Sequence, residues 1–296
     1  MPNIINYAQQ FERTIENRYR QGALSGALGT SSARFINTNT IQIPRLDVGG
    51  YKEHNRSGGW NRQNLTNTWE PKTLLHDRDV QFFVDTMDVD ETNLVLSAAN
   101  VTAEFLSSQA IPEVDSYRFS KLYYEYATAF GKTPETGTLD SSTVLEMFDE
   151  FYRKADEAEV PQEGRMLYMT PTTAKLLKTA TQVTRSVDAR QAGAVNRAVT
   201  ALDTLEIKST PSVRMLTAYD FTDGCLPGAG AQQINMIMVH PTAVLSPIKH
   251  SAIYLKGPDQ HDQGDGWLYQ NRMYMDLFLL ERKVTGVYMH VGPVAA

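Results

Sequence analysis

Two short stretches carry residues that could bind a metal ion. The run DTMDVDETN, residues 85–93, holds four carboxylates, whose oxygens are ligands for hard cations. Its spacing lacks the glycine that lets a calcium-binding loop turn, whereas acidic side chains at the start of a helix cap free amides and suit the helix dipole. The run QHDQGDG, residues 260–266, brings together His261, Asp262 and Asp265, but a turn with two glycines is typical of a solvated loop. We therefore expect no metal site in either stretch.

Other patterns associated with catalysis or cofactor binding are absent or incomplete. The sequence has no phosphate-binding loop, no H-E-x-x-H and no G-x-S-x-G. The run GAGAQQ, residues 228–233, begins like a dinucleotide fingerprint but lacks the third glycine and the following helix, so it predicts a turn. The carboxylates Glu146, Asp149 and Glu150 share one side of a predicted helix, as on the solvent face of an amphipathic helix. We therefore predict no catalytic residue, no cofactor and no enzymatic activity.

Composition and charge indicate a globular chain of 296 residues with enough apolar residues for a core. The formal net charge of −6 argues against a protein whose main task is to grip nucleic-acid phosphates, because that task needs a basic face. The single cysteine, Cys225, excludes an internal disulfide, and we expect it to be a small buried hydrophobe. No apolar run approaches the roughly 18 residues of a membrane span, and no signal peptide is recognisable, so we expect cytosol-like surroundings.

The N-terminal part is predicted to be an arm. Residues 7–20 place Phe11, Ile15 and Tyr19 four residues apart, which indicates a thin apolar stripe on a helix. This stripe is too small to fold alone, and the segment after it is rich in small residues. We therefore expect the arm to dock on another surface.

Residues 35–48 and 65–85 are predicted to be strands on either side of a long glycine-flanked loop, residues 49–64. Both strands are mostly polar, so this projecting hairpin has little core of its own. The loop carries Trp60 in surroundings too hydrophilic to bury it within the chain. An exposed indole is typical of a contact surface.

The remaining chain alternates helices and strands, which predicts an α+β fold with a sheet flanked by helices. One helix is expected over residues 93–108 and a second from Pro112 to Gly131, because proline favours the first helical turn and glycine the end. We predict a mobile loop inside Gln182–Leu205, because that stretch is polar and weakly patterned. The other predicted helices are 141–160 and 172–180, and the predicted strands are 165–171, 233–241 and a long β region after residue 250.

Four stretches, in order, resemble major capsid proteins of tailed bacteriophages with the Hong Kong 97 fold. They are IQIPRLDVGGY, TWEPKTLLHDRDVQFFVDTMDVDETN, AIPEVDSYRFSKL and DGWLYQNRMYMDLFLLERKVTGVYMHV. The resemblance covers about residues 5–292, and none of the stretches is a catalytic motif.

The resemblance implies an α+β, Hong Kong 97-like fold with an N-terminal arm, an extended loop (E-loop), a peripheral domain with a spine helix, and an axial domain. The implied boundaries are 1–35 for the arm, 36–84 for the E-loop hairpin, 85–131 for the peripheral domain with its spine helix, 132–240 for the axial domain, 241–280 for the closing strands of the peripheral domain, and 281–296 for the last axial strand and C-terminus.

The resemblance also implies a structural role in the virion, with assembly in the bacterial cytoplasm. The expected partners are further copies in hexamers and pentamers, a separate scaffolding protein because the sequence starts at the arm, a portal protein, and packaged double-stranded DNA bound without sequence specificity; no membrane is expected. Contacts between subunits are expected from Phe11, Ile15 and Tyr19 in the arm, and from Tyr51, Lys52, Arg56, Trp60 and Arg62 in the E-loop.

Some members of this family join subunits by a Lys–Asn isopeptide bond, but Lys52, Asn271 and Glu281 cannot be matched to that chemistry, so we expect non-covalent shells. Two alternatives stay open from the sequence. One is an encapsulin, a cellular nanocompartment with the same fold. The other is a small α+β carbohydrate hydrolase that uses two carboxylates.

Overall fold

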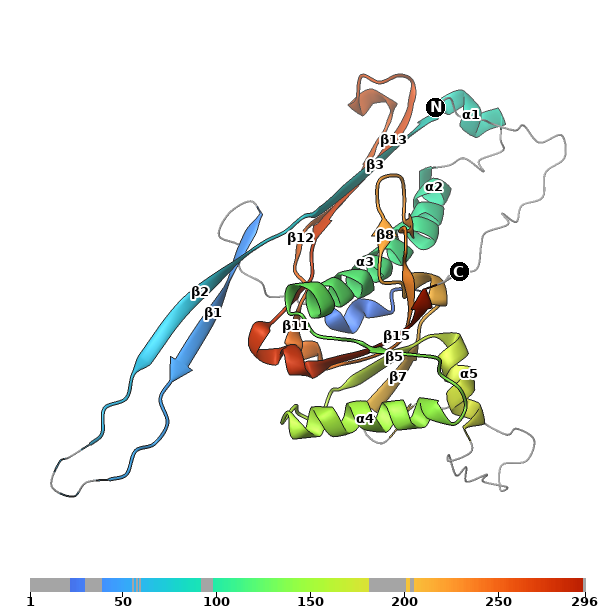
Figure 1. Ribbon diagram of the computed structural model, residues 1–296. Coiled ribbons are helices and arrows are strands. Elements are labelled where there is room, and N and C mark those ends of the chain that lie inside the picture. Colours follow the sequence, from blue (N-terminus) through green and yellow to red (C-terminus); the bar gives the residue numbers. More distant parts are fainter. Residues whose placement is uncertain are drawn as a thin grey trace, which may run out of the picture.

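The computed structural model describes residues 22–29, 39–54, 56, 58, 60–91, 98–180, 201–202 and 205–294. A six-stranded sheet lies at its centre, in the order β4 (Glu135–Thr136), β15 (Val287–Val294), β10 (Gln232–Val239), β5 (Met166–Met169), β7 (Leu205–Ser209) and β6 (Ala201–Leu202). The middle strand β10 is antiparallel to both of its neighbours, while β5 and β7 are parallel. The predicted α+β arrangement of a sheet with flanking helices is confirmed (Figure 1).

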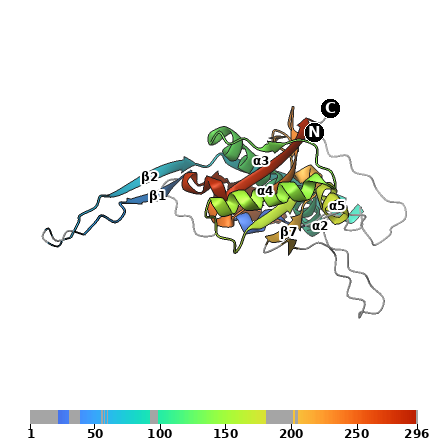
Figure 2. The same cartoon turned by 60° about the horizontal axis from the view of Figure 1, so that its bottom comes forward.

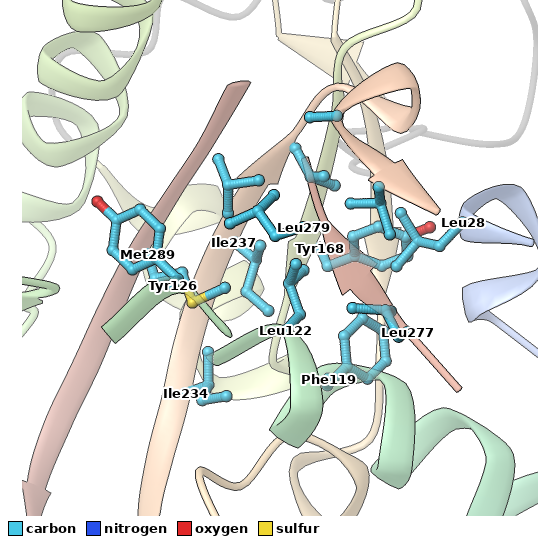
Figure 3. Packing of buried hydrophobic residues seen from close by; sticks show 14 of the residues in the cluster. Leu28, Phe119, Leu122, Tyr126, Tyr168, Ile234, Ile237, Leu277, Leu279 and Met289 are labelled. Atoms are coloured by element: carbon cyan, nitrogen blue, oxygen red, sulfur yellow. The ribbon is translucent and has the colours of Figure 1, made fainter. Parts of the chain in front are cut away.

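Helices cover both faces of this sheet, which explains why its central strands are almost wholly apolar. On one face, side chains of β5 and β10 pack against Phe119 and Leu122 of helix α3 (Ile111–Tyr123), as Figure 3 shows. On the other face they pack against Phe148 and Phe151 of α4 (Thr143–Glu157) and Leu177 of α5 (Pro171–Thr179). Neighbouring residues alternate between the two cores, as strand geometry requires.

One long helix runs from Ala98 to Ala129 through the body of the molecule. It consists of α2 (Ala98–Phe105), a π-helical turn (Leu106–Ala110), α3 and a second π-helical turn (Tyr124–Ala129). The prediction of a separate helix starting at Pro112 was wrong. Proline lacks the N–H and its ring clashes with the preceding turn, and the wider π turn just before Pro112 lets the helix continue. Gly131, with φ +61°, ends it as predicted.

A three-stranded antiparallel sheet packs beside this helix, in the order β12 (Ile248–Lys256), β13 (Gly266–Met275) and β3 (His76–Asp85). The predicted strand over residues 65–85 is therefore two strands. Its first part, β2 (Leu65–Thr73), pairs only with β1 (Thr40–Val48) in a separate two-stranded ribbon. The chain changes sheets at Leu74 and Leu75, between the last residue of β2 and the first of β3.

The smaller elements complete the description. The short helix α1 (Thr86–Glu91) follows β3, and two-residue strands pair as β8 (Tyr219–Asp220) with β9 (Leu226–Pro227) and β11 (Val244–Leu245) with β14 (Phe278–Leu279). Single 3₁₀ turns occupy Ser25–Leu28, Ser212–Arg214, Pro241–Ala243, Pro258–Gln260 and Glu281–Gly286. Among the described helices, none is long and apolar enough to cross a membrane.

Several sequence predictions fall wholly or partly outside the described residues, among them the starts of the predicted strand 35–48 and of the predicted helix 93–108. The arm residues Phe11, Ile15 and Tyr19 lie outside the described residues. Most of the predicted loop from Gln182 to Leu205 does too, but its end is regular, because Ala201–Leu202 form β6 and the buried Leu205 begins β7.

The core between the long helix and the central sheet is expected to supply much of the stability. Leu122 is fully buried there, so Leu122→Ala should lower the free energy of unfolding by about 2–5 kcal/mol, measured by urea denaturation. The exposed Leu226 is the matched control, and Leu226→Ala should change it by no more than about 0.5 kcal/mol. Equal effects of the two variants would contradict the assignment of this core.

Candidate assembly interface

The ribbon of β1 and β2 projects away from the rest of the described molecule, as Figures 1 and 2 show from two directions. Its nine paired positions run from Thr40 opposite Thr73 to Val48 opposite Leu65. Ile41 at the base of β1 is buried, but from Leu46 outward the described residues of β1 are all exposed, so the outer part of the ribbon has no buried face. A two-stranded ribbon of this kind has little stability of its own in water.

The outer part of the ribbon exposes apolar side chains. Trp60 is 95% exposed, and Tyr51 is fully exposed. More than half of the surface of four further apolar side chains is exposed along the strands: Leu46, Val48, Leu65 and Trp69. The sequence prediction that Trp60 finds no burial within the chain is confirmed. Such a concentration of exposed apolar surface is typical of a protein contact site.

The loop that carries Trp60 is held by few contacts of its own. The Gly49 amide donates to the Asn64 carbonyl at 3.2 Å, and the Gln63 side chain donates to the Gly50 carbonyl at 2.6 Å. Farther out, the nearest ring to Trp60 is that of His54, with the ring centroids 6.4 Å apart. The two ends of the loop are thus tied together while its tip is presented to solvent.

The base of the ribbon is fixed to the body by a buried carboxylate, Asp276. It accepts a hydrogen bond from the Leu75 amide at 2.9 Å and another from the Tyr117 hydroxyl at 2.7 Å, so it joins the strand crossover to the long helix. Beside it, Ile41, Leu74 and Phe278 form a small apolar cluster. The Tyr274 hydroxyl also donates to the Leu74 carbonyl, at 2.9 Å. These contacts set the direction in which the ribbon leaves the body.

Ion pairs add a second attachment along β1. Arg45 pairs with Glu70 across the ribbon and with Glu281 on the body, and Arg282 of the body pairs with Asp47. Both of the body residues belong to the 3₁₀ turn Glu281–Gly286. The Arg282–Asp47 pair is exposed and the Arg45 pairs are only partly buried. Exposed pairs contribute about 1 kcal/mol or less, so the buried base is the main attachment of the ribbon.

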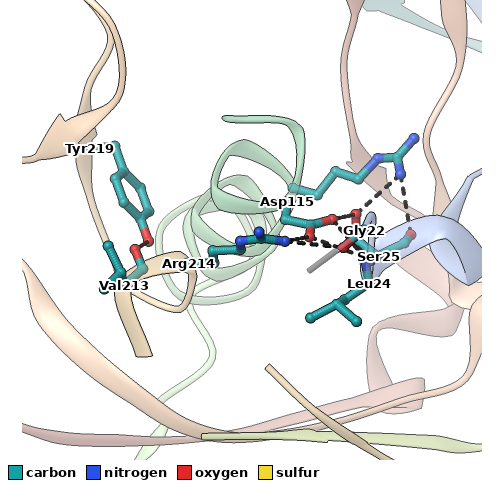
Figure 4. A network of polar contacts seen from close by, with 8 residues as sticks. Gly22, Leu24, Ser25, Asp115, Val213, Arg214 and Tyr219 are labelled. Carbon is teal, nitrogen blue, oxygen red and sulfur yellow. Dashed lines mark hydrogen bonds and ion pairs between the residues drawn. The ribbon is translucent and has the colours of Figure 1, made fainter. Parts of the chain in front are cut away.

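A second buried carboxylate, Asp115 on the long helix, fixes the segment Gly22–Gly29 (Figure 4). It is fully buried and accepts hydrogen bonds from the Leu24 and Ser25 amides, each at 3.0 Å, and from Arg214 at 2.9 Å. Arg118 on the same helix donates to the Ser25 carbonyl and to Ser246. Ser246 in turn donates to the backbone carbonyl of Asp276 at 3.0 Å, so the hydrogen bonds around Asp115 extend to the main chain at Asp276.

His76 sits at the same base, where β3 begins. Its ring stacks on Tyr117 with the centroids 3.7 Å apart, and Phe221 packs edge-on against it. Burial, with help from the nearby Arg78 guanidinium, lowers the pKa of His76 to about 4. Glu113 lies 3.6 Å away, too far for a hydrogen bond, and burial raises the pKa of that carboxyl. The imidazole is therefore neutral in the folded protein.

The candidate metal-binding and reactive residues from the sequence do not form a common site. Within the described ranges, no group of three His, Cys, Asp or Glu side chains could hold a metal ion. The His261 ring is engaged by its own loop through the Gly266 carbonyl at 2.9 Å. The acids of residues 85–93 were predicted to cap the helix over residues 93–108, whereas Asp85 caps α1 through the Met87 amide. Cys225 was expected to be a small buried hydrophobe, but it is only half-buried. The partial burial still raises the pKa of its thiol to about 11, which disfavours a reactive thiolate.

The remaining two candidates are also structural. Glu150 pairs with Arg153 on the exposed side of α4, opposite the buried Phe148 and Phe151. Residues 228–231 form a turn, as predicted, with φ +70° at Gly230, and β10 begins at Gln232.

No family model and no curated protein matches the chain, but many solved structures do. A chain from Mycobacterium phage Che8 is 15% identical, with a TM-score of 0.63 over 97% of this chain and 98% of that one. The asymmetric unit of the bacteriophage PhiM1 mature capsid is 12% identical, with a TM-score of 0.68 over 98% of this chain and 93% of that one. The capsid of cyanophage P-SCSP1u is 11% identical, with a TM-score of 0.64 over 97% of this chain and 93% of that one.

This chain has the fold of phage capsid proteins. The likeness extends over almost the whole of both chains. The expected α+β capsid fold is therefore confirmed.

Sequence reasoning missed Asp115, Arg118 and Asp276, the residues that hold this capsid fold together. A signal was present, because Asp276 is the single charge in the apolar run MYMDLFLL and has to find partners when buried. The identity of those partners was not readable, since Leu75 lies 201 residues away.

We predict that Asp276→Ala leaves the Leu75 amide and the Tyr117 hydroxyl without their buried acceptor. The free energy of unfolding should fall by about 2–4 kcal/mol, and the amides at the strand crossover should exchange with deuterium faster. Asp77 is the control, because its pair with Arg272 lies at the surface, so Asp77→Ala should cost no more than about 1 kcal/mol. An Asp276 variant as stable as the Asp77 variant would contradict the anchoring role.

Because His76 is buried in its neutral form, the protein should be less stable in mild acid. An unfolded histidine has a pKa of about 6.5, so as the pH falls from about 6.5 toward 4 the unfolded chain binds a proton that the folded chain does not. This group alone should lower the free energy of unfolding by about 2 kcal/mol between about pH 7 and about pH 5. His76→Phe keeps a stacking ring and should remove this part of the pH dependence of the unfolding free energy, measured by urea denaturation at several pH values. An unchanged pH dependence would contradict the neutral state of the buried imidazole.

Proposed function

We propose that the chain is the major capsid protein of a tailed double-stranded DNA bacteriophage, a structural protein of the virion without enzymatic activity. Its copies assemble into the hexamers and pentamers of a closed icosahedral shell. The observation that carries this proposal is the likeness to the PhiM1 mature capsid over 98% of this chain. The exposed apolar ribbon is an independent support, since it has no use in an isolated subunit.

The parts of the subunit are proposed to have these roles. Residues 1–35 are the N-terminal arm, 36–84 the E-loop, 85–131 and 241–280 the peripheral domain with its spine helix, and 132–240 with 281–296 the axial domain. The ribbon of β1 and β2 is the structured part of the E-loop and extends over a neighbouring subunit. Contacts between subunits are proposed for Tyr51, Lys52, Arg56, Trp60 and Arg62 in the E-loop and for Phe11, Ile15 and Tyr19 in the arm.

The partners of the proposed shell are a separate scaffolding protein, a portal protein and the enclosed DNA. The net charge of −6 suits a shell that encloses DNA without holding it through phosphate contacts. Lys52 lies on the ribbon loop, while Asn271 and Glu281 belong to the body of the same subunit, and we propose that the shell is held without covalent links.

Two other functions are less well supported. An encapsulin would share the fold, but the similar solved structures include phage capsids, among them those of PhiM1 and P-SCSP1u. A carbohydrate hydrolase needs two carboxylates facing a sugar-binding cleft. Among the described buried carboxylates, Asp115 and Asp276 are instead saturated by structural hydrogen bonds, and Glu125 is paired with Lys121.

Shortening the loop tests the role of the ribbon. Deleting residues 51–62 joins Gly50 to Gln63, two residues that already contact each other, and leaves a four-residue turn between β1 and β2. The subunit should keep its circular dichroism and unfolding free energy, because the deleted tip is exposed. Particle formation, measured by sedimentation and electron microscopy, should be lost or much reduced.

Trp60→Ala is the finer variant, and Trp60→Phe is its aromatic control. A buried indole covers about 150–250 Å², which corresponds to at most about 4–6 kcal/mol per contact before ordering costs. Closed symmetry repeats this loss at every equivalent interface. Particles of the alanine variant should therefore melt at lower temperature than those of the phenylalanine variant. Normal, equally stable particles from the deletion would show that the loop is an idle surface.

A further inference from the structure

A groove of about 860 Å³ lies between the long helix and the three-stranded sheet. In Figure 1 its walls are α2 and α3 on one side and β3, β12 and β13 on the other. Its apolar lining comes from both walls: Phe82, Phe105, Ile111, Val114, Ile253 and Met273. Ile253 is 49% exposed, which is unusual for an apolar side chain in a groove between two packed elements. The groove therefore offers a ready apolar binding surface.

The charges around this groove are mainly negative. Four carboxylates line it, from Asp77, Asp79, Glu113 and Asp223, but Asp77 is paired with Arg272 and Glu113 with Arg78, so Asp79 and Asp223 carry the negative charge that remains. Arg78 is already bound to Glu113 at 2.9 Å and to backbone carbonyls of the 221–224 loop, so it has little positive charge to offer a ligand. An occupant with an apolar stripe and a positive excess would suit this groove.

The N-terminal end of the described segment Gly22–Gly29 lies at the edge of the groove. Ala23 is one of the lining residues, and the next two residues are held by Asp115 through the Leu24 and Ser25 amides. The 21 residues before Gly22 therefore start from a fixed point beside the groove. In an α-helix, the 12 residues from Ala23 back to Phe11 span about 18 Å.

The sequence of this N-terminal segment matches the chemistry of the groove. Its predicted helix, residues 7–20, presents the stripe of Phe11, Ile15 and Tyr19. The segment carries three arginines, Arg13, Arg18 and Arg20, against two glutamates, Glu12 and Glu16. Arg18 and Arg20 are the cations closest in sequence to the point where the chain reaches the groove.

We propose that in the unassembled subunit this groove binds residues 7–20 of the same chain, with the apolar stripe against the apolar lining and the arginines toward the carboxylates. A short tether favours the same chain over a second copy, because it keeps the segment at a millimolar effective concentration. The docked segment covers apolar surface that a free subunit would otherwise expose. This inference concerns the free subunit and holds or fails independently of the proposed shell.

Photo-crosslinking of the full-length chain tests the docking. Benzoylphenylalanine replaces Ile15 in the stripe or, as the control, Asn17 on the opposite side of the predicted helix. Dilute, unassembled protein is prepared as an equal mixture of ¹⁵N-labelled and unlabelled subunits, irradiated and digested, and the crosslinked peptides are identified by mass spectrometry. The label at position 15 should reach residues 105–114, 251–253 or 271–273 within single-isotope chains, severalfold more often than the label at position 17.

Two matched groove variants complete the test. Ile253 faces the groove, while its neighbour Tyr254 points to the other side of the strand and is 51% exposed. Ile253→Lys should reduce the groove crosslinks severalfold, and Tyr254→Lys should leave them unchanged, with both variants checked by circular dichroism. Crosslinks only between chains of different isotope would overturn the proposal in favour of a neighbouring copy's segment. Crosslinks confined to other surfaces, or equal effects of the two lysine variants, would overturn it outright.

Discussion

The buried carboxylate of Asp276 is the constraint on which the shape of this subunit depends. A carboxylate taken out of water must be fully hydrogen-bonded, and Asp276 meets this demand with the Leu75 amide, the Tyr117 hydroxyl and the Leu277 amide. These three donors come from the strand crossover, the long helix and the chain after β13. Satisfying one charge therefore fixes how the ribbon leaves the body.

Asp115 applies the same principle at the other side of the long helix. Its carboxylate orients the segment Gly22–Gly29, and the link through Arg118 and Ser246 connects it to the main chain at Asp276. The subunit thus has a stiff polar network at its centre and a ribbon with almost no core of its own. Rigid attachment with an exposed apolar tip is the combination that an intersubunit contact needs, because little ordering cost is left for binding.

The sequence predicted well the elements whose signal is local. Helix α4 has a strong 3.6-residue period, β10 is an uninterrupted apolar run, and the glycine-flanked loop with Trp60 reads directly as an exposed tip. The switch between sheets at Leu74 and Leu75 was not predictable, because a tertiary contact with Asp276 decides it. The rule that proline marks the first turn of a helix also failed at Pro112, which lies inside a continuous helix. The π turn that accommodates Pro112 has no sequence signature of its own.

The most direct test of the account is electron microscopy of the purified protein, expressed alone and together with the proteins encoded beside its gene. The account predicts closed, icosahedral shells built from hexamers and pentamers under at least one of these conditions. A monodisperse subunit of 33.2 kDa, or a small fixed oligomer, under all of them would contradict the central claim that this fold is used to build a shell.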